Sequence, residues 1–101
     1  MTQLIQNHRQ DLIQVAKDNK IDYLALYGSH ARGENTDASD IDLLVSFDKK
    51  ASVSLFDLAS IQIKMSEILG KKVDLVTKSG LSQYVRPYIQ DDIQVIYAKK
   101  S

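Results

Sequence analysis

Two aspartates, Asp40 and Asp42, flank a single isoleucine at the start of an apolar stretch that runs to Phe47. Side chains at positions i and i+2 of a strand point the same way, with backbone positions about 6–7 Å apart. The two carboxylates can therefore converge on one or two cations. Because hard oxygen ligands suit Mg²⁺ or Mn²⁺ better than zinc, and the chain has no cysteine, the spacing predicts a site for one of these ions.

A third acidic residue, Asp74, lies between Val73 and Leu75 in another apolar stretch. Like Asp42, it stands between two apolar residues, so in a strand its side chain points to the face opposite theirs. This makes Asp74 a candidate third carboxylate. Three carboxylates around two metal ions suit in-line phosphoryl or nucleotidyl transfer, in which one ion lowers the pKa of the attacking hydroxyl and both neutralise charge on the phosphorus. The third carboxylate can bind the metal on the nucleophile side or accept the proton.

A Gly-Ser turn, Gly28-Ser29, follows the apolar stretch 21–27, and ten residues separate it from Asp40. Glycine lets the backbone approach a phosphate closely, and the N–H groups of a following helical turn can hold phosphates together with the Ser29 hydroxyl. Arg32 lies one turn further on and can contact phosphate or pair with a carboxylate. A Gly-Ser turn or an Asp-x-Asp pair alone is weak, but the two together at this spacing indicate a site for a nucleoside triphosphate.

A plain structural alternative stays open, in which Gly28-Ser29 is an ordinary turn and the aspartates lie at a strand edge or point outward. The period of a strand predicts a core face of Ile41, Leu43, Val45 and Phe47 and an opposite face of Asp40, Asp42, Leu44 and Ser46. Every carboxylate on these two strands falls opposite the core residues, and the alternative does not explain this.

The apolar periodicity and the turn residues predict alternating helices and strands. We expect a helix over 2–19 with Thr2 as N-cap, a strand over 21–27, a helical turn over 29–32, a strand over 40–47, a helix over 55–69, a strand over 72–77, a short helix over 82–90 and a strand over 93–98. This αβ(turn)βαβαβ order predicts an α/β or α+β fold, with a small mixed sheet flanked by helices.

Length and composition narrow the class of protein. The 101 residues suit one domain, 1–101, and the 44% hydrophobic and 26% charged composition is that of a globular protein. The formal net charge is zero and the lysines are scattered, so we expect no direct binding of nucleic acid. No signal-peptide core or membrane-spanning apolar run is evident, so a cytoplasmic location is expected.

The Gly-Ser-His-Ala-Arg-Gly segment beginning at Gly28, followed by Ser-Asp-Ile-Asp-Leu around Asp40 and Asp42, resembles the DNA polymerase beta-type nucleotidyltransferase superfamily. It is most similar to the minimal nucleotidyltransferase (MNT) branch. Asp74, in Lys-Val-Asp-Leu-Val, matches the third carboxylate of that family. His30 occupies a variable position of the motif and is expected either to support the site from behind or to be exposed.

The resemblance implies a function. Small members of this family act as antitoxins that transfer AMP from ATP to a tyrosine of a HEPN-domain RNase toxin. Carried over, Gly28 and Ser29 bind the triphosphate, Asp40 and Asp42 bind two Mg²⁺ ions (or Mn²⁺), and Asp74 assists the acceptor hydroxyl as a catalytic residue and metal ligand. The resemblance thus implies ATP as substrate and a cognate HEPN toxin as partner.

Two other functions stay open at this point. The protein could be an antitoxin that neutralises the toxin by complex formation without catalysis. It could also be a small-molecule nucleotidyltransferase of the aminoglycoside-modifying kind, which ranks lower because a chain of 101 residues leaves no room for an acceptor-binding domain.

Overall fold

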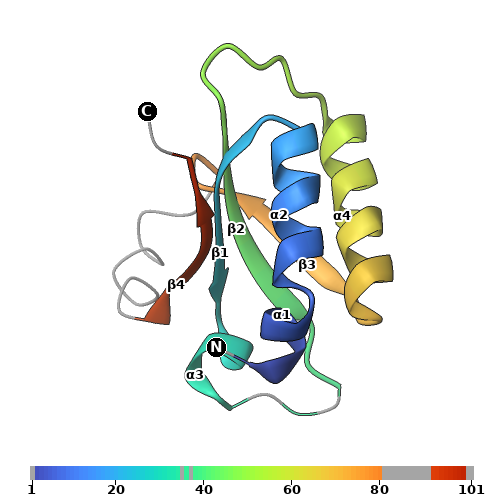
Figure 1. The fold of residues 1–101 in the computed structure, drawn as a ribbon, viewed down its shortest axis with the longest axis vertical. Coiled ribbons are helices and arrows are strands. Elements are labelled where there is room, and N and C mark those ends of the chain that lie inside the picture. The colour runs from blue at the N-terminus through green and yellow to red at the C-terminus, as the bar shows by residue number, and fades with distance from the viewer. Residues whose placement is uncertain (1, 35, 37, 81–91, 100–101) are drawn as a thin grey trace.

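In the computed structural model, which describes residues 2–34, 36, 38–80 and 92–99, four strands form one mixed sheet (Figure 1). They are β1 (Ile21–Tyr27), β2 (Ile41–Phe47), β3 (Val73–Thr77) and β4 (Gln94–Ala98), in the spatial order β3-β2-β1-β4. β1 is antiparallel to β2 and β4, and β2 is parallel to β3. The predicted mixed sheet is confirmed, and the helix predicted over 82–90 lies outside the described residues.

The helices cover one face of this sheet. They are α1 (Gln3–Asn7), α2 (Arg9–Asp18), α3 (Ser29–Arg32) and α4 (Leu55–Leu69). α2 and α4 lie side by side on one side of the sheet, and α3 lies at the end of β1 (Figure 1). Within the described residues, none of the helices combines the length and apolar character needed to cross a membrane.

The predicted single helix over 2–19 is interrupted at His8, where the backbone leaves helical geometry at φ −113° and ψ 12°. The His8 N–H donates to the Ile5 carbonyl at 3.2 Å and ends α1, and the His8 carbonyl accepts from Leu12 at 3.0 Å in the first turn of α2. Ile5 and Leu12 are both fully buried, so the apolar period continues across the break. The sequence pattern alone could not reveal it. Thr2 caps α1 as predicted.

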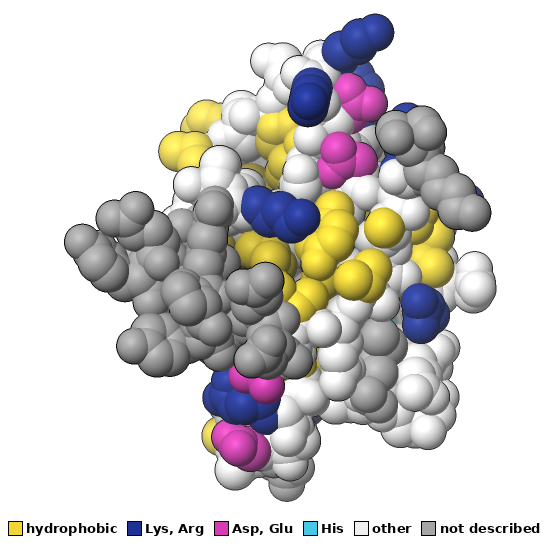
Figure 2. Space-filling model, turned by 90° about the vertical axis from the view of Figure 1, so that its left-hand side faces the viewer, with side chains coloured by type: hydrophobic (Ala, Val, Ile, Leu, Met, Phe, Trp, Pro, Cys, Tyr) yellow, Lys and Arg dark blue, Asp and Glu magenta, His cyan; other side chains and the backbone are white. Residues whose placement is uncertain are grey.

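The core lies between the sheet and α2 and α4. The predicted core positions Ile41, Leu43 and Val45 are fully buried, and Phe47 packs partly against them. Leu44, on the carboxylate face, is also buried, at 2% exposure. Figure 2 shows the face that points away from the helices, where apolar side chains gather near the centre. The face that carries the carboxylates is therefore partly apolar; the alternating pattern placed Leu44 on this face but did not predict that it is buried.

α4 has defined ends. The Ser54 side chain accepts from the Asp57 N–H at 3.1 Å, and the Asp57 carboxylate accepts from the Ser54 N–H at 3.0 Å, which is a capping box. Gly70 ends the helix in the left-handed conformation. These contacts fix where the longest helix begins and ends over the sheet.

We expect Ser54→Ala to lower the free energy of unfolding by about 1 kcal/mol, because the first turn of α4 loses its side-chain acceptor. Urea unfolding followed by circular dichroism measures the change. Ser60→Ala, an exposed serine within the same helix, serves as the control and should change stability by less than about 0.5 kcal/mol. Equal effects of the two substitutions would contradict the capping assignment.

Candidate active site

Three side chains stand in a row across three neighbouring strands. Tyr27 of β1 is paired with Asp42 of β2, and Asp42 is paired with Asp74 of β3. Paired residues of adjacent strands project from the same face of a sheet, so all three lie on the face opposite the helices. The structure thus brings together the two predicted strand carboxylates. Tyr27 was not predicted, because its place in the row depends on the β1–β2 register.

Like charges crowd this row. Burial raises the pKa of Asp42 above its ordinary value, and the carboxylates of Asp74 and Asp40 raise this pKa further. The side chains of His30 and Arg32 lower the pKa of Asp42 by smaller amounts. The net effect is a raised pKa of Asp42, so the carboxylates crowd this half-buried face with negative charge, which favours a bound cation.

Tyr27 responds to the same charges. Burial is the main cause that raises the pKa of the Tyr27 phenol, and the carboxylates of Asp42 and Asp74 add to it. The phenol is thus kept protonated at neutral pH. A neutral hydroxyl group next to two carboxylates can donate a hydrogen bond within the site.

Asp40 lies one residue before β2, whereas the sequence predicted a strand that begins at Asp40. Its Oδ2 atom lies 3.8 Å from Nζ of Lys72, in an ion pair at the surface. Within the described part of the chain, no three acidic or histidine side chains are close enough together to hold one metal ion. The chemistry of the three carboxylates fits a hard divalent cation, and Asp40, whose charge acts on Asp42, already forms an ion pair with Lys72.

Gly28 packs directly against Asp42. A Cβ atom built on Gly28 would lie 2.5 Å from Oδ2 of Asp42, closer than atoms of side chains approach. The backbone at Gly28 has φ 79° and ψ −153°, a region that glycine alone adopts without strain. The turn that follows β1 therefore passes over the carboxylate of β2, and only glycine fits there.

The predicted helical turn after Gly28 is present as α3. Its later N–H groups, those of Ala31 and Arg32, donate to the Gly28 carbonyl at 3.1 Å. Ser29 begins the turn, and the first N–H groups of a helical turn have no acceptor within it. Ser29 directly follows Gly28, which packs on Asp42, so the turn begins beside the carboxylate row.

Arg32 pairs with two carboxylates other than those of Asp40 and Asp42. Its Nε atom lies 3.1 Å from Glu34, and its NH1 atom lies 3.8 Å from Asp92. The hydrogen bond with Glu34 is the main cause that raises the pKa of Arg32. This is one of the two predicted contacts of Arg32, and the contact with phosphate stays a prediction.

His30 is buried, with 4% of its surface exposed, so of the two alternatives expected for it the exposed one does not apply. No sequence signal could indicate this burial, because a four-residue turn is too short to show a hydrophobic period. His30 lies behind the site, as the other expectation had it.

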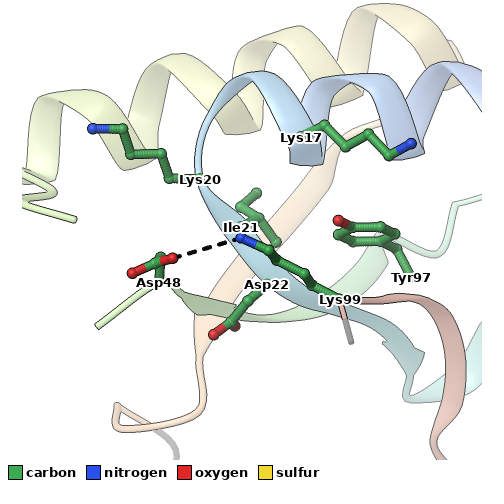
Figure 3. Close-up of a pocket in the computed structure, with 7 residues that line it drawn as sticks. All are labelled: Lys17, Lys20, Ile21, Asp22, Asp48, Tyr97 and Lys99. Atoms are coloured by element: carbon green, nitrogen blue, oxygen red, sulfur yellow. Dashed lines mark ion pairs between the residues drawn. The ribbon is translucent and has the colours of Figure 1, made fainter. Parts of the chain in front are cut away.

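A cavity of about 270 Å³ lies at the opposite end of the sheet, where β1 begins and β4 ends. Figure 3 shows the residues that line it. Lys99 is paired with Asp48 at 3.8 Å, and the side chains of Lys17 and Lys20 extend in opposite directions. Because these cations do not converge on a common point, the carboxylate row remains the better candidate for an active site.

With this geometry in view, the comparison with known proteins defines the class of protein. The nucleotidyltransferase domain family matches residues 8–96, and the chain belongs to this family. A relative from Methanocaldococcus jannaschii, provisionally named protein adenylyltransferase MJ1379, is 37% identical over 93 residues, which cover 90% of this chain and 89% of the relative.

Two solved structures share the fold. One is described as a minimal nucleotidyltransferase; it has a TM-score of 0.76 and 28% identity, and the match covers 89% of this chain and 90% of that one. The other is a chain in the complex of the tri-AMPylated HEPN toxin of Shewanella oneidensis with its MNT antitoxin. That match has a TM-score of 0.70 and 20% identity over 93% of this chain and 72% of that one. The predicted family and fold class are confirmed.

Gly28→Ala should destabilise the protein by about 1–3 kcal/mol from backbone strain alone, with the clash against Asp42 in addition. Gly33→Ala is the matched control, since Gly33 also has positive φ (72°) but no atom lies within 4 Å of the place that a Cβ would take there. Urea unfolding compares the two. We expect Gly28→Ala to be the more damaging, and Asp42→Ala to restore part of the loss in the double variant. Equal losses in the two glycine variants would contradict the close contact.

Asp42→Asn should raise the melting temperature of the metal-free protein at neutral pH. Because the folded pKa of Asp42 is raised, ionisation of Asp42 disfavours the folded state; this penalty is absent below the unfolded pKa and grows as the pH rises through the folded pKa. The advantage of the variant should therefore vanish below about pH 4, near the unfolded pKa of aspartate. Thermal melts across pH in a chelating buffer test this. A variant no more stable than wild type at neutral pH would contradict the assignment.

Proposed function

We propose that this protein is an Mg²⁺-dependent protein adenylyltransferase that transfers AMP from ATP to a tyrosine of a cognate HEPN-type RNase toxin and so acts as its antitoxin. The observation that carries the proposal is the row of Asp42 and Asp74, with the glycine turn packed on Asp42. Support for a protein substrate comes from the provisional name of the M. jannaschii relative, and support for the partner comes from the S. oneidensis complex.

In this proposal the backbone of Gly28 and Ser29 binds the phosphates of ATP. The absence of a side chain at Gly28 lets the backbone of the turn lie directly against Asp42, so a phosphate bound on this turn would lie next to the carboxylate. Arg32 is the third proposed contact with the nucleotide. Since its guanidinium already pairs with Glu34 and Asp92, it would share its donors between these carboxylates and phosphate.

Asp40, Asp42 and Asp74 would hold two Mg²⁺ ions, or Mn²⁺. When bound, the ions would lower the pKa of the acceptor hydroxyl and neutralise charge on the transferred phosphorus. To bind the metal, Asp40 would have to give up its ion pair with Lys72. This ion pair lies at the surface and is therefore weak. The charge crowding around Asp42 supports this assignment, because a cation would relieve it.

The remaining chemistry involves the acceptor tyrosine of the toxin and this protein's own side chains. The acceptor tyrosine oxygen forms a bond to the α-phosphorus while the bond to pyrophosphate breaks, and Asp74 assists the acceptor hydroxyl by taking its proton. Tyr27, whose phenol stays protonated, would donate a hydrogen bond beside the carboxylates and so help to orient them.

A second candidate is an antitoxin that neutralises by binding alone. The outer surface of α4 favours it, because Leu55 and Phe56 are 83% and 88% exposed and Ile63 is 59% exposed. Apolar side chains that remain in water are typical of surfaces that contact another protein.

The direct test incubates the protein with Mg²⁺, ATP labelled at the α-phosphate, and the toxin encoded by the adjacent gene. Wild type should label the toxin on tyrosine, and Asp40→Ala/Asp42→Ala should not. Asp11→Ala/Asp18→Ala, which removes two exposed aspartates of α2, is the matched control and should label like wild type. Equal labelling by wild type and the Asp40/Asp42 variant would contradict catalysis at this site.

Neutralisation of the toxin in cells separates the two candidates. If catalysis is required, the Asp40→Ala/Asp42→Ala variant should still bind the toxin but fail to neutralise it. If that variant protects cells as well as wild type does, binding alone is sufficient and the second candidate is correct.

A further inference from the structure

His30 is the one polar residue that is buried among the described residues, and it connects the two halves of the site. It belongs to α3, and its Nε2 atom lies 3.4 Å from the carbonyl oxygen of Ser39, the residue before Asp40. Because a carbonyl oxygen can only accept, Nε2 must carry the proton. The contact therefore ties the turn after β1 to the residue that precedes the first aspartate.

Ser39 is itself held in place. Its N–H donates to the Thr36 carbonyl at 3.0 Å, and its Oγ atom accepts from the Thr36 N–H at 2.9 Å. The carbonyl that faces His30 thus belongs to a residue that is hydrogen-bonded to Thr36 through both its backbone and its side chain.

A second side chain holds α3 from the opposite side. Nε2 of Gln94, the first residue of β4, donates to the Ala31 carbonyl at 3.0 Å. β4 and β2 lie on either side of β1 in the sheet, so Gln94 connects α3 to one neighbour of β1 and His30 connects it to the segment that leads into the other.

Each of these two side chains also keeps one buried atom without a hydrogen-bond partner. Nδ1 of His30 and Oε1 of Gln94 are two of the three such side-chain atoms among the described residues, and the third belongs to Asp22. Unpaired buried polar atoms lower stability. In both side chains the donor nitrogen is the paired atom, and each donor links α3 to another segment, so we interpret the two residues as links that hold this turn.

We propose that His30 and Gln94 are positioning residues that hold α3 from two sides, fix Gly28 and Ser29 over Asp42, and thereby set the affinity for the nucleoside triphosphate. The proposal rests on the proposed function, since it requires that the turn binds ATP.

The test measures the dissociation constant of a non-hydrolysable ATP analogue with Mg²⁺, by calorimetry well below the melting temperature. His30→Leu and Gln94→Met, which keep the size but remove the donor, should each weaken binding ~3–10-fold, the value of about one hydrogen bond. His30→Gln, whose amide can replace Nε2–H, should restore most of the affinity. Gln94→Glu, which puts an acceptor opposite the Ala31 carbonyl, should weaken binding at least as much as Gln94→Met and serves as the test if His30→Leu does not fold.

Asn19→Leu is the matched control, because the Asn19 side chain donates to the Val15 carbonyl at 2.8 Å at the far end of the sheet. It should lower the melting temperature and leave the dissociation constant unchanged. If wild type binds the analogue and the His30 and Gln94 variants bind it equally well, the positioning role is overturned while the proposed function stands. If wild type does not bind the analogue, both are overturned.

Discussion

The site depends on one close contact, in which the backbone of Gly28 lies against the carboxylate of Asp42 with no room for a side chain between them. The register of β1 and β2 makes this contact unavoidable, since Tyr27 is paired with Asp42 and the chain turns at the next residue. The turn proposed to bind phosphate and the carboxylate proposed to bind metal are therefore packed directly against each other. The helices α2 and α4 stabilise the sheet that maintains this register.

The same arrangement has an energetic cost that the rest of the fold must offset. Two carboxylates on adjacent positions of parallel strands, with a third nearby, repel one another on a partly apolar face. Sites that bind a cation and an anionic substrate commonly hold like charges close together, and ligand binding relieves their repulsion. The buried aliphatic core on the opposite face of the sheet supplies the compensating stability.

Features that follow from local pattern could be predicted, and features that follow from packing could not. Strand period placed Asp42 and Asp74 opposite the core, and the mixed sheet and α4 followed from the order and spacing of the apolar stretches. The break at His8 is invisible to periodicity because the apolar stripe continues through it. The burial of His30 depends on how α3 packs near Ser39, and the place of Tyr27 in the row depends on the pairing of β1 with β2; no single segment encodes either.

The Asp42–Asp74 pair and the Gly28 turn would act together, as a joint site for a divalent metal and ATP. The most direct test is calorimetric titration of ATP into the protein with and without Mg²⁺, for wild type and for Asp42→Asn/Asp74→Asn. We expect Mg²⁺ to strengthen ATP binding by wild type and to leave binding by the variant unchanged. An equal effect of Mg²⁺ on both proteins, or none on wild type, would contradict a joint site.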